Sequence, residues 1–92
     1  MAEIAGGWSG WNFEITSKEK LVFEEALKGL LGVRYRPLAV ATQVVAGLNY
    51  AFLSEGTGVY PEAQTNVFVI HIYAPLPGHG APHVTGITKV NP

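Results

Sequence analysis

The sequence predicts an α+β fold in which one helix packs against an antiparallel sheet of four to five strands. One segment, residues 16–31, has the apolar spacing of an amphipathic helix. Four apolar, strand-like runs follow it, with turn-forming residues between most of them. A helix followed by hairpin-connected strands is typical of α+β domains, and here only the helix can cover the apolar face of the sheet.

Length and composition indicate a single domain, residues 1–92, that is stabilised by packing alone. Of the 92 residues 48% are apolar and none is cysteine. A small domain without disulfides suits a reducing compartment. The sequence shows neither the run of about 20 apolar residues that spans a bilayer nor a basic region followed by an apolar stretch, as in a signal peptide. We therefore expect a cytoplasmic protein with no membrane partner.

The charge pattern argues against nucleic-acid binding. The net charge is −1, and the six basic residues are scattered, with only Arg34 and Arg36 close together. Nucleic-acid binding requires a concentrated basic face.

The N-terminal third is expected to contain a flexible lead, a short strand and the helix. Residues 11–15 alternate apolar and polar, as in a strand. Thr16 and Glu19 then have the spacing of a capping box, which starts a helix that runs to about Leu31. The predicted apolar stripe of this helix consists of Phe23, Ala26, Leu27, Leu30 and Leu31.

Two glycines define the expected end of this helix. Gly32 is a natural C′ residue in the left-handed conformation. Gly29 would lie inside the helix, where glycine costs about 1 kcal/mol relative to alanine. Its presence therefore suggests that a strand passes close to the helix at that point.

The remainder of the chain is expected to form the sheet. Pro37 lacks a ladder donor and implies a bulge or an edge position in the first long strand. The expected segments, in order, are strands at 33–45 and 48–54, a long loop at 55–66, a strand at 67–74, a hairpin loop at 75–82 and a strand at 83–90.

The first expected hairpin has an unusual tip, Gln43-Val44-Val45-Ala46-Gly47. Turns are usually built from Asn, Asp, Ser, Pro and Gly, whereas Gly47 is the only turn residue here. An apolar tip in water suggests a surface that a partner covers. The alternative is one continuous buried strand with Gly47 as a bulge.

Catalytic and metal-binding chemistry is poorly supported. The chain has no cysteine and no aspartate, so a hydrolase would have to use Ser54, His71 and Glu55. Ser54 and Glu55 are adjacent and would point to opposite faces of a strand. His79 and His83 are four apart, but Gly80 and Pro82 rule out the helix that a metal-binding pair of this spacing needs. We expect no enzyme activity and no cofactor.

Three separated motifs resemble those of the stefins, the cystatins without disulfides, which inhibit papain-like cysteine proteases. Gln43-x-Val45-x-Gly47 resembles the first binding hairpin of the cystatins, and Leu76-Pro77-Gly78 the second binding loop of the stefins. Ile4-Ala5-Gly6-Gly7 looks like the stefin N-terminal trunk. The motifs occur in the family's order and cover nearly the whole chain.

The resemblance implies a sheet wrapped around one helix and a protease-binding wedge at one end of the molecule. The implied protease-binding residues are Ile4, Ala5, Gly6, Gly7, Gln43, Val44, Val45, Ala46, Gly47, Leu76, Pro77 and Gly78. The wedge would block the catalytic cysteine of a papain-like protease. Trp8 departs from the stefin pattern, which has a smaller apolar residue there. Trp8 and Trp11 could anchor a partner or cap the open end of the core.

The active form is expected to be a monomer, with a domain-swapped dimer as an alternative state. The hairpin must turn with β-branched valines beside its tip, and straightening would relieve the expected strain. A second hypothesis is a cystatin-fold binding module or dimer without inhibitory activity, which would need neither the trunk glycines nor Leu-Pro-Gly. A third is a small enzyme or ligand carrier using the concave face of the sheet, which no residue supports.

Overall fold

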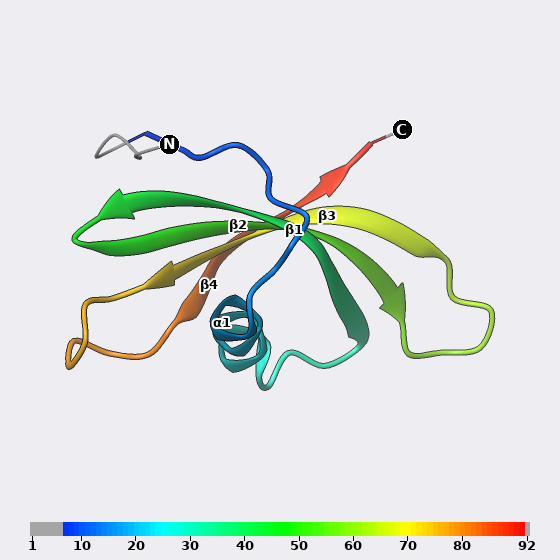
Figure 1. Cartoon of the computed structure of the whole chain (residues 1–92). Helices are drawn as coiled ribbons and strands as arrows, with labels where there is room; N and C mark the ends of the chain where they lie inside the picture. Colours follow the sequence, from blue (N-terminus) through cyan, green and yellow to red (C-terminus); the bar gives the residue numbers. More distant parts are fainter. Residues whose placement is uncertain (1–6, 92) are drawn as a thin grey trace.

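The computed structural model describes residues 7–91 and has one helix and one four-stranded sheet. The elements in chain order are α1 (Ser17–Leu27), β1 (Val33–Val45), β2 (Gly47–Gly58), β3 (Thr65–Ala74) and β4 (His83–Val90). Figure 1 shows the helix lying across one face of the sheet. The predicted α+β architecture is confirmed, with four strands. Within residues 7–91, no helix is long and apolar enough to cross a membrane.

The four strands form an antiparallel meander in the order β1-β2-β3-β4. The register of β1 against β2 shifts between Pro37 and Ala39, so the bulge predicted at Pro37 is confirmed. A second shift falls between His71 and Ile72, opposite β4. The two bulges bend and twist the strands, which helps the sheet to curve around the helix.

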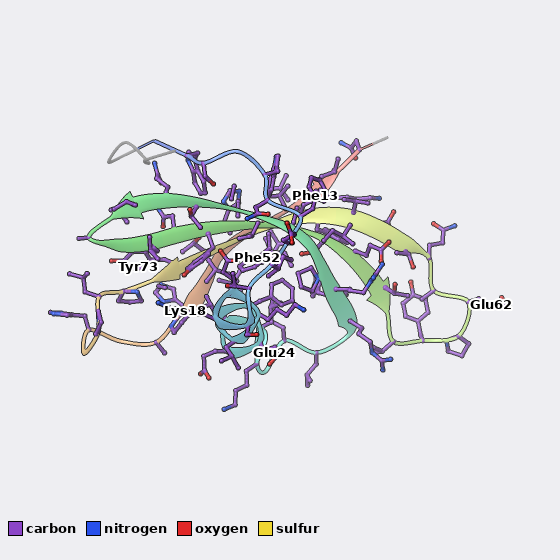
Figure 2. The ribbon with its side chains drawn as sticks, viewed as in Figure 1. Phe13, Lys18, Glu24, Phe52, Glu62 and Tyr73 are labelled. Carbon is purple, nitrogen blue, oxygen red and sulfur yellow. The ribbon has the colours of Figure 1, made fainter. Side chains whose placement is uncertain are left out.

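The core lies between the sheet and α1. Its buried side chains are Phe23, Val40, Tyr50, Phe52, Ile70 and Ile72. The rings of Phe23 and Phe52 meet edge to face with their centroids 4.9 Å apart, and Figure 2 shows Phe52 between sheet and helix. The helix therefore covers the apolar face, as predicted.

The capping box at the start of α1 is confirmed. The amide of Glu19 donates to the Thr16 hydroxyl at 3.1 Å, and the amide of Thr16 donates to the Glu19 carboxylate at 2.9 Å. These two bonds satisfy amides that the first turn of a helix leaves unpaired.

The predicted end of the helix, at about Leu31, is wrong. The helix ends at Leu27, Lys28 is the C-cap, and Gly29 follows with a φ of +92°. Gly29 is thus the C′ residue that we had assigned to Gly32, and no heavy atom lies within 4 Å of where its Cβ would be, so no strand packs there. Leu30 and Leu31 are 46% and 92% exposed and do not belong to the apolar stripe.

The predicted strand at 11–15 is also wrong, because the N-terminal segment pairs with β1 earlier and only in part. Two isolated bridges join Trp8 to Gln43 and Asn12 to Val40. Asn12 and Val40 exchange backbone hydrogen bonds of 2.8 and 2.9 Å. Residues 8–12 therefore cover part of the outer edge of β1.

The loop between β2 and β3 is shorter than the predicted 55–66. Both strands extend into it, with Glu55 paired to Val67 and Thr57 to Thr65, which leaves only residues 59–64. The Arg36 guanidinium binds the Glu55 carboxylate at 2.6 Å across β1 and β2. Figure 1 shows this loop at the opposite end of the sheet from the β1–β2 hairpin.

Candidate functional site

The apolar pentapeptide 43–47 forms the tip of the hairpin between β1 and β2. Val45 pairs with Gly47, which leaves Ala46 alone at the turn. The hairpin is thus confirmed over a continuous strand. The positive φ falls on Gly47, at +110°, whereas the only non-glycine residue with a positive φ in the described chain is Glu62. Glycine adopts a positive φ readily, so the turn does not impose on the valines the backbone strain that we expected there.

The hairpin tip presents apolar side chains to solvent. Val44 is 38% exposed and Val45 is 39% exposed. They are adjacent in a strand, so they point to opposite faces of the hairpin. No residue from Gln43 to Gly47 carries a charge. The tip is therefore a thin apolar edge that can enter a cleft with either face against a wall.

The second loop is built on a tight turn with a protruding leucine. The amide of His79 donates to the Leu76 carbonyl at 3.0 Å, and Gly78 has a φ of +83°. Proline followed by a glycine of positive φ is typical of a type II turn, which explains the sequence Leu-Pro-Gly. Leu76, at the start of the turn, is 49% exposed.

Gly47 brings the hairpin and the second loop together. A Cβ on Gly47 would collide with the Ala74 carbonyl oxygen and would lie 3.1 Å from the Pro75 Cα. A hollow of about 280 Å³ beside this contact is lined by Gly47, Leu48, Pro75 and Leu76, among others. Tyr50 also lines it, and burial, followed by the charge of Glu19, raises the pKa of its hydroxyl.

Tyr73 makes a second connection between these elements. Its hydroxyl, at the end of β3, donates a hydrogen bond to the Ala46 carbonyl at the hairpin tip. Its ring meets that of His83 edge to face with centroids 5.8 Å apart. Figure 2 shows Tyr73 at the end of the sheet that carries both hairpins. The sequence does not indicate this bond, because only the strand register brings β3 alongside the tip.

The root of the predicted trunk lies at the same end. The bridge between Trp8 and Gln43 places Gly7 next to the base of the hairpin. The Asn49 side-chain amide donates to the Gln43 side chain at 2.8 Å and closes that base. Ile4, Ala5 and Gly6 lie outside the described residues. The start of the described chain, the hairpin 43–47 and the loop 76–78 therefore lie at one end of the sheet, in that order across it (Figure 1).

The two tryptophans do not cap the end of the core. Each is 46% exposed. The ring of Trp8 meets that of His71 edge to face, with centroids 6.1 Å apart, and His71 lies on the sheet face opposite the helix. Trp8 thus packs on the outer face, a position that its sequence context did not indicate.

The residues considered for catalysis each make other contacts. Ser54 is fully buried and its hydroxyl donates to the Phe52 carbonyl at 3.2 Å. Glu55 binds Arg36, and His71 contacts Trp8. Among residues 7–91, no group of three or more His, Asp or Glu side chains is arranged to hold a metal ion.

Comparison with known proteins agrees with this architecture. No protein-family model and no curated protein matches the sequence. A solved structure does match: a secreted type 1 cystatin from Fasciola hepatica, at 26% identity and a TM-score of 0.66, over 95% of this chain and 98% of that one. The chain has the cystatin fold and is similar to a type 1 cystatin. The near-complete coverage of both chains means that this protein and the Fasciola hepatica cystatin share the helix and the sheet. The roles of the individual site residues stay predictions.

Removing the Tyr73 hydroxyl should loosen the hairpin tip. A Tyr73→Phe variant keeps the ring but loses the bond to Ala46, which is worth about 1 kcal/mol. If the tip binds a protease, the dissociation constant for papain should rise roughly fivefold. Tyr60→Phe is the matched control, because Tyr60 lies in the distant 59–64 loop and is 66% exposed. Equal effects of the two variants would show that the bond does not matter for binding.

Proposed function

We propose that this protein is a reversible, competitive inhibitor of papain-like cysteine proteases and is not itself an enzyme. The observation that carries the proposal is the packing of Gly47 against Ala74 and Pro75. It joins two uncharged, exposed apolar turns into one edge beside the root of the trunk. Exposed apolar edges of this kind are costly in water and indicate a surface that a partner covers.

The proposed mechanism is steric blockage of the catalytic cysteine. Residues 43–47 would fill the middle of the protease cleft, and Leu76, Pro77 and Gly78 would contact its primed side. The trunk, Ile4 to Gly6, would lie in the unprimed subsites. The β1–β2 ladder and the Tyr73 hydroxyl hold the tip in one conformation. A tip held in this way does not present a peptide carbonyl aligned for attack, so no acyl-enzyme should form.

A titration of papain with the purified chain tests the proposal. The two turns are already in place on the sheet, so they need little ordering on binding, and a dissociation constant near nanomolar or below is reachable. Inhibition should be competitive with a peptide substrate, and the recovered chain should be intact by mass spectrometry. Full papain activity at micromolar concentrations of the chain, or cleavage within the hairpin, would rule the proposal out.

A charge in the trunk should weaken inhibition without affecting the fold. Gly6→Glu adds a side chain and a charge where backbone is proposed to lie against an apolar cleft. We expect the loss of affinity to appear mainly as faster dissociation, measured by stopped flow. The thermal midpoint should stay unchanged. An unaltered inhibition constant would show that the trunk takes no part in binding.

We further propose that the protein acts in the cytoplasm, because a small domain without cysteine does not depend on an oxidising compartment. The similar Fasciola hepatica cystatin is described as secreted, which makes localisation worth measuring directly. Fractionation of the producing cells decides it, and recovery of the native protein in the medium would contradict the proposal.

A further inference from the structure

Trp8 lies at the same end of the molecule as the proposed wedge, but the proposed binding mode gives its ring no role. The backbone of residues 8–9 is fixed to β1: Trp8 bridges Gln43, and the Ser9 amide donates to the Thr42 carbonyl at 2.8 Å. The Thr42 amide donates back to the Ser9 hydroxyl at 2.9 Å. The indole then lies over the outer face of the sheet and reaches His71 in β3. One residue therefore ties the start of the described chain both to an edge strand and to a strand further into the sheet.

The outer face has a hollow beside this ring. A hollow of about 250 Å³ is lined by Trp8, Asn49, His71 and Gly86, among others. Gly86 pairs with His71 and has no side chain, and no heavy atom lies within 4 Å of where its Cβ would be, so the space beside it is open. A smaller apolar residue at position 8 would not extend as far toward His71.

We propose that Trp8 is a positioning residue that fixes where the N-terminal trunk leaves the sheet, and so sets how much the trunk contributes to protease binding. Gly7 separates Trp8 from the trunk and tolerates many backbone conformations. A trunk attached at an anchored root has fewer conformations to lose on binding than one attached at an unanchored root. The inference rests on the proposed inhibitory function and deepens it.

A double-mutant cycle in the full-length chain tests the inference. Trp8→Ala should weaken papain binding about tenfold when the trunk is intact. In a chain that already carries Gly6→Glu, the same substitution should have little further effect, because two changes that act through one segment are not additive. Trp8→Phe, which keeps an aromatic ring, should recover part of the loss.

Trp11→Ala is the matched control. Trp11 is exposed to the same extent as Trp8, and it has no ring contact with another aromatic residue in the described chain. It should leave papain binding unchanged. An equal loss from Trp8→Ala in both trunk backgrounds would show that the indole contacts the protease or acts through the fold. That result, or no loss in either background, would overturn the inference.

A measurement without protease separates this inference from the proposed function. The chain contains no cysteine, so Ala5→Cys provides a single site for a nitroxide label. We expect the label to broaden the NMR signals of residues near the hairpin base. Trp8→Ala should make this broadening weaker and distribute it over more residues. Trp11→Ala should leave it unchanged. Identical broadening in all three chains would overturn the positioning role, even if papain is inhibited. A failure to inhibit papain would instead refute the proposed function alone.

Discussion

Gly47→Ala should weaken papain inhibition by about 100-fold or more, a loss of roughly 2.7 kcal/mol of binding free energy. Alanine at a φ of +110° is strained, and its Cβ would collide with the Ala74 carbonyl oxygen. The hairpin must then move away from the second loop, and the two turns can no longer enter one cleft together. The inhibition constant, measured well below the thermal midpoint so that the variant is fully folded, reports this loss.

Gly32→Ala separates the displaced hairpin from simple backbone strain. Gly32 has a similar φ of +95°, but no heavy atom lies within 4 Å of where its Cβ would be. It lies in the connection between α1 and β1, away from both turns. Both variants should unfold at a lower temperature than the parent chain, by an amount corresponding to about 1–3 kcal/mol. Only Gly47→Ala should lose affinity, and an equal loss of affinity in both variants would contradict the role assigned to the Gly47 contact.

Mild heating should convert part of the monomer into a domain-swapped dimer that does not inhibit papain. Only Ala46 separates the paired residues Val45 and Gly47, so opening this turn joins β1 and β2 into one strand from Val33 to Gly58. Two chains can then exchange the helix and β1. The joined strand has no hairpin tip, so it cannot enter a cleft. Size-exclusion chromatography with papain inhibition measured on each peak shows the result.

Two substitutions at the turn should shift the dimer fraction in opposite directions. Gly47→Val disfavours the positive φ of the turn and favours an extended backbone, so it should raise the fraction of dimer. Val45→Gly weakens the joined strand, because glycine is a poor strand residue, and should lower that fraction. A dimer peak that inhibits papain fully would show that association leaves the hairpin free, and the swap mechanism would be wrong.

Most of the fold could be predicted because its elements have strong local signals. The apolar run of the predicted strand 67–74 is one such signal, and the structure buries Ile70 and Ile72 of this strand in the core. The capping box and the bulge at Pro37 are also local features. The wrong predictions concern where helices and strands begin and end, because two residues near such a boundary can each be suited to form it. Gly29 and Gly32 are both suited to end a helix, and sequence alone favoured the wrong one.

The candidate site could be predicted only in the parts that are continuous in sequence. The hairpin 43–47 and the turn 76–78 each carry their own motif, and the structure places them at one end. Tyr73 could not be found, because its bond to Ala46 depends on a register between strands that are far apart in the chain. The contact of Trp8 with His71 likewise depends on the path of the N-terminal segment over the sheet.

The central claim is that one end of the molecule, formed by the trunk, the hairpin and the second loop, enters the protease cleft. The most direct test is an NMR titration of the isotope-labelled chain with unlabelled papain. The account predicts large changes in the signals of residues 4–7, 43–47 and 76–78, with the 59–64 loop at the opposite end unaffected. Changes centred on the 59–64 loop, or on the outer face of the sheet with the hairpin unaffected, would contradict it.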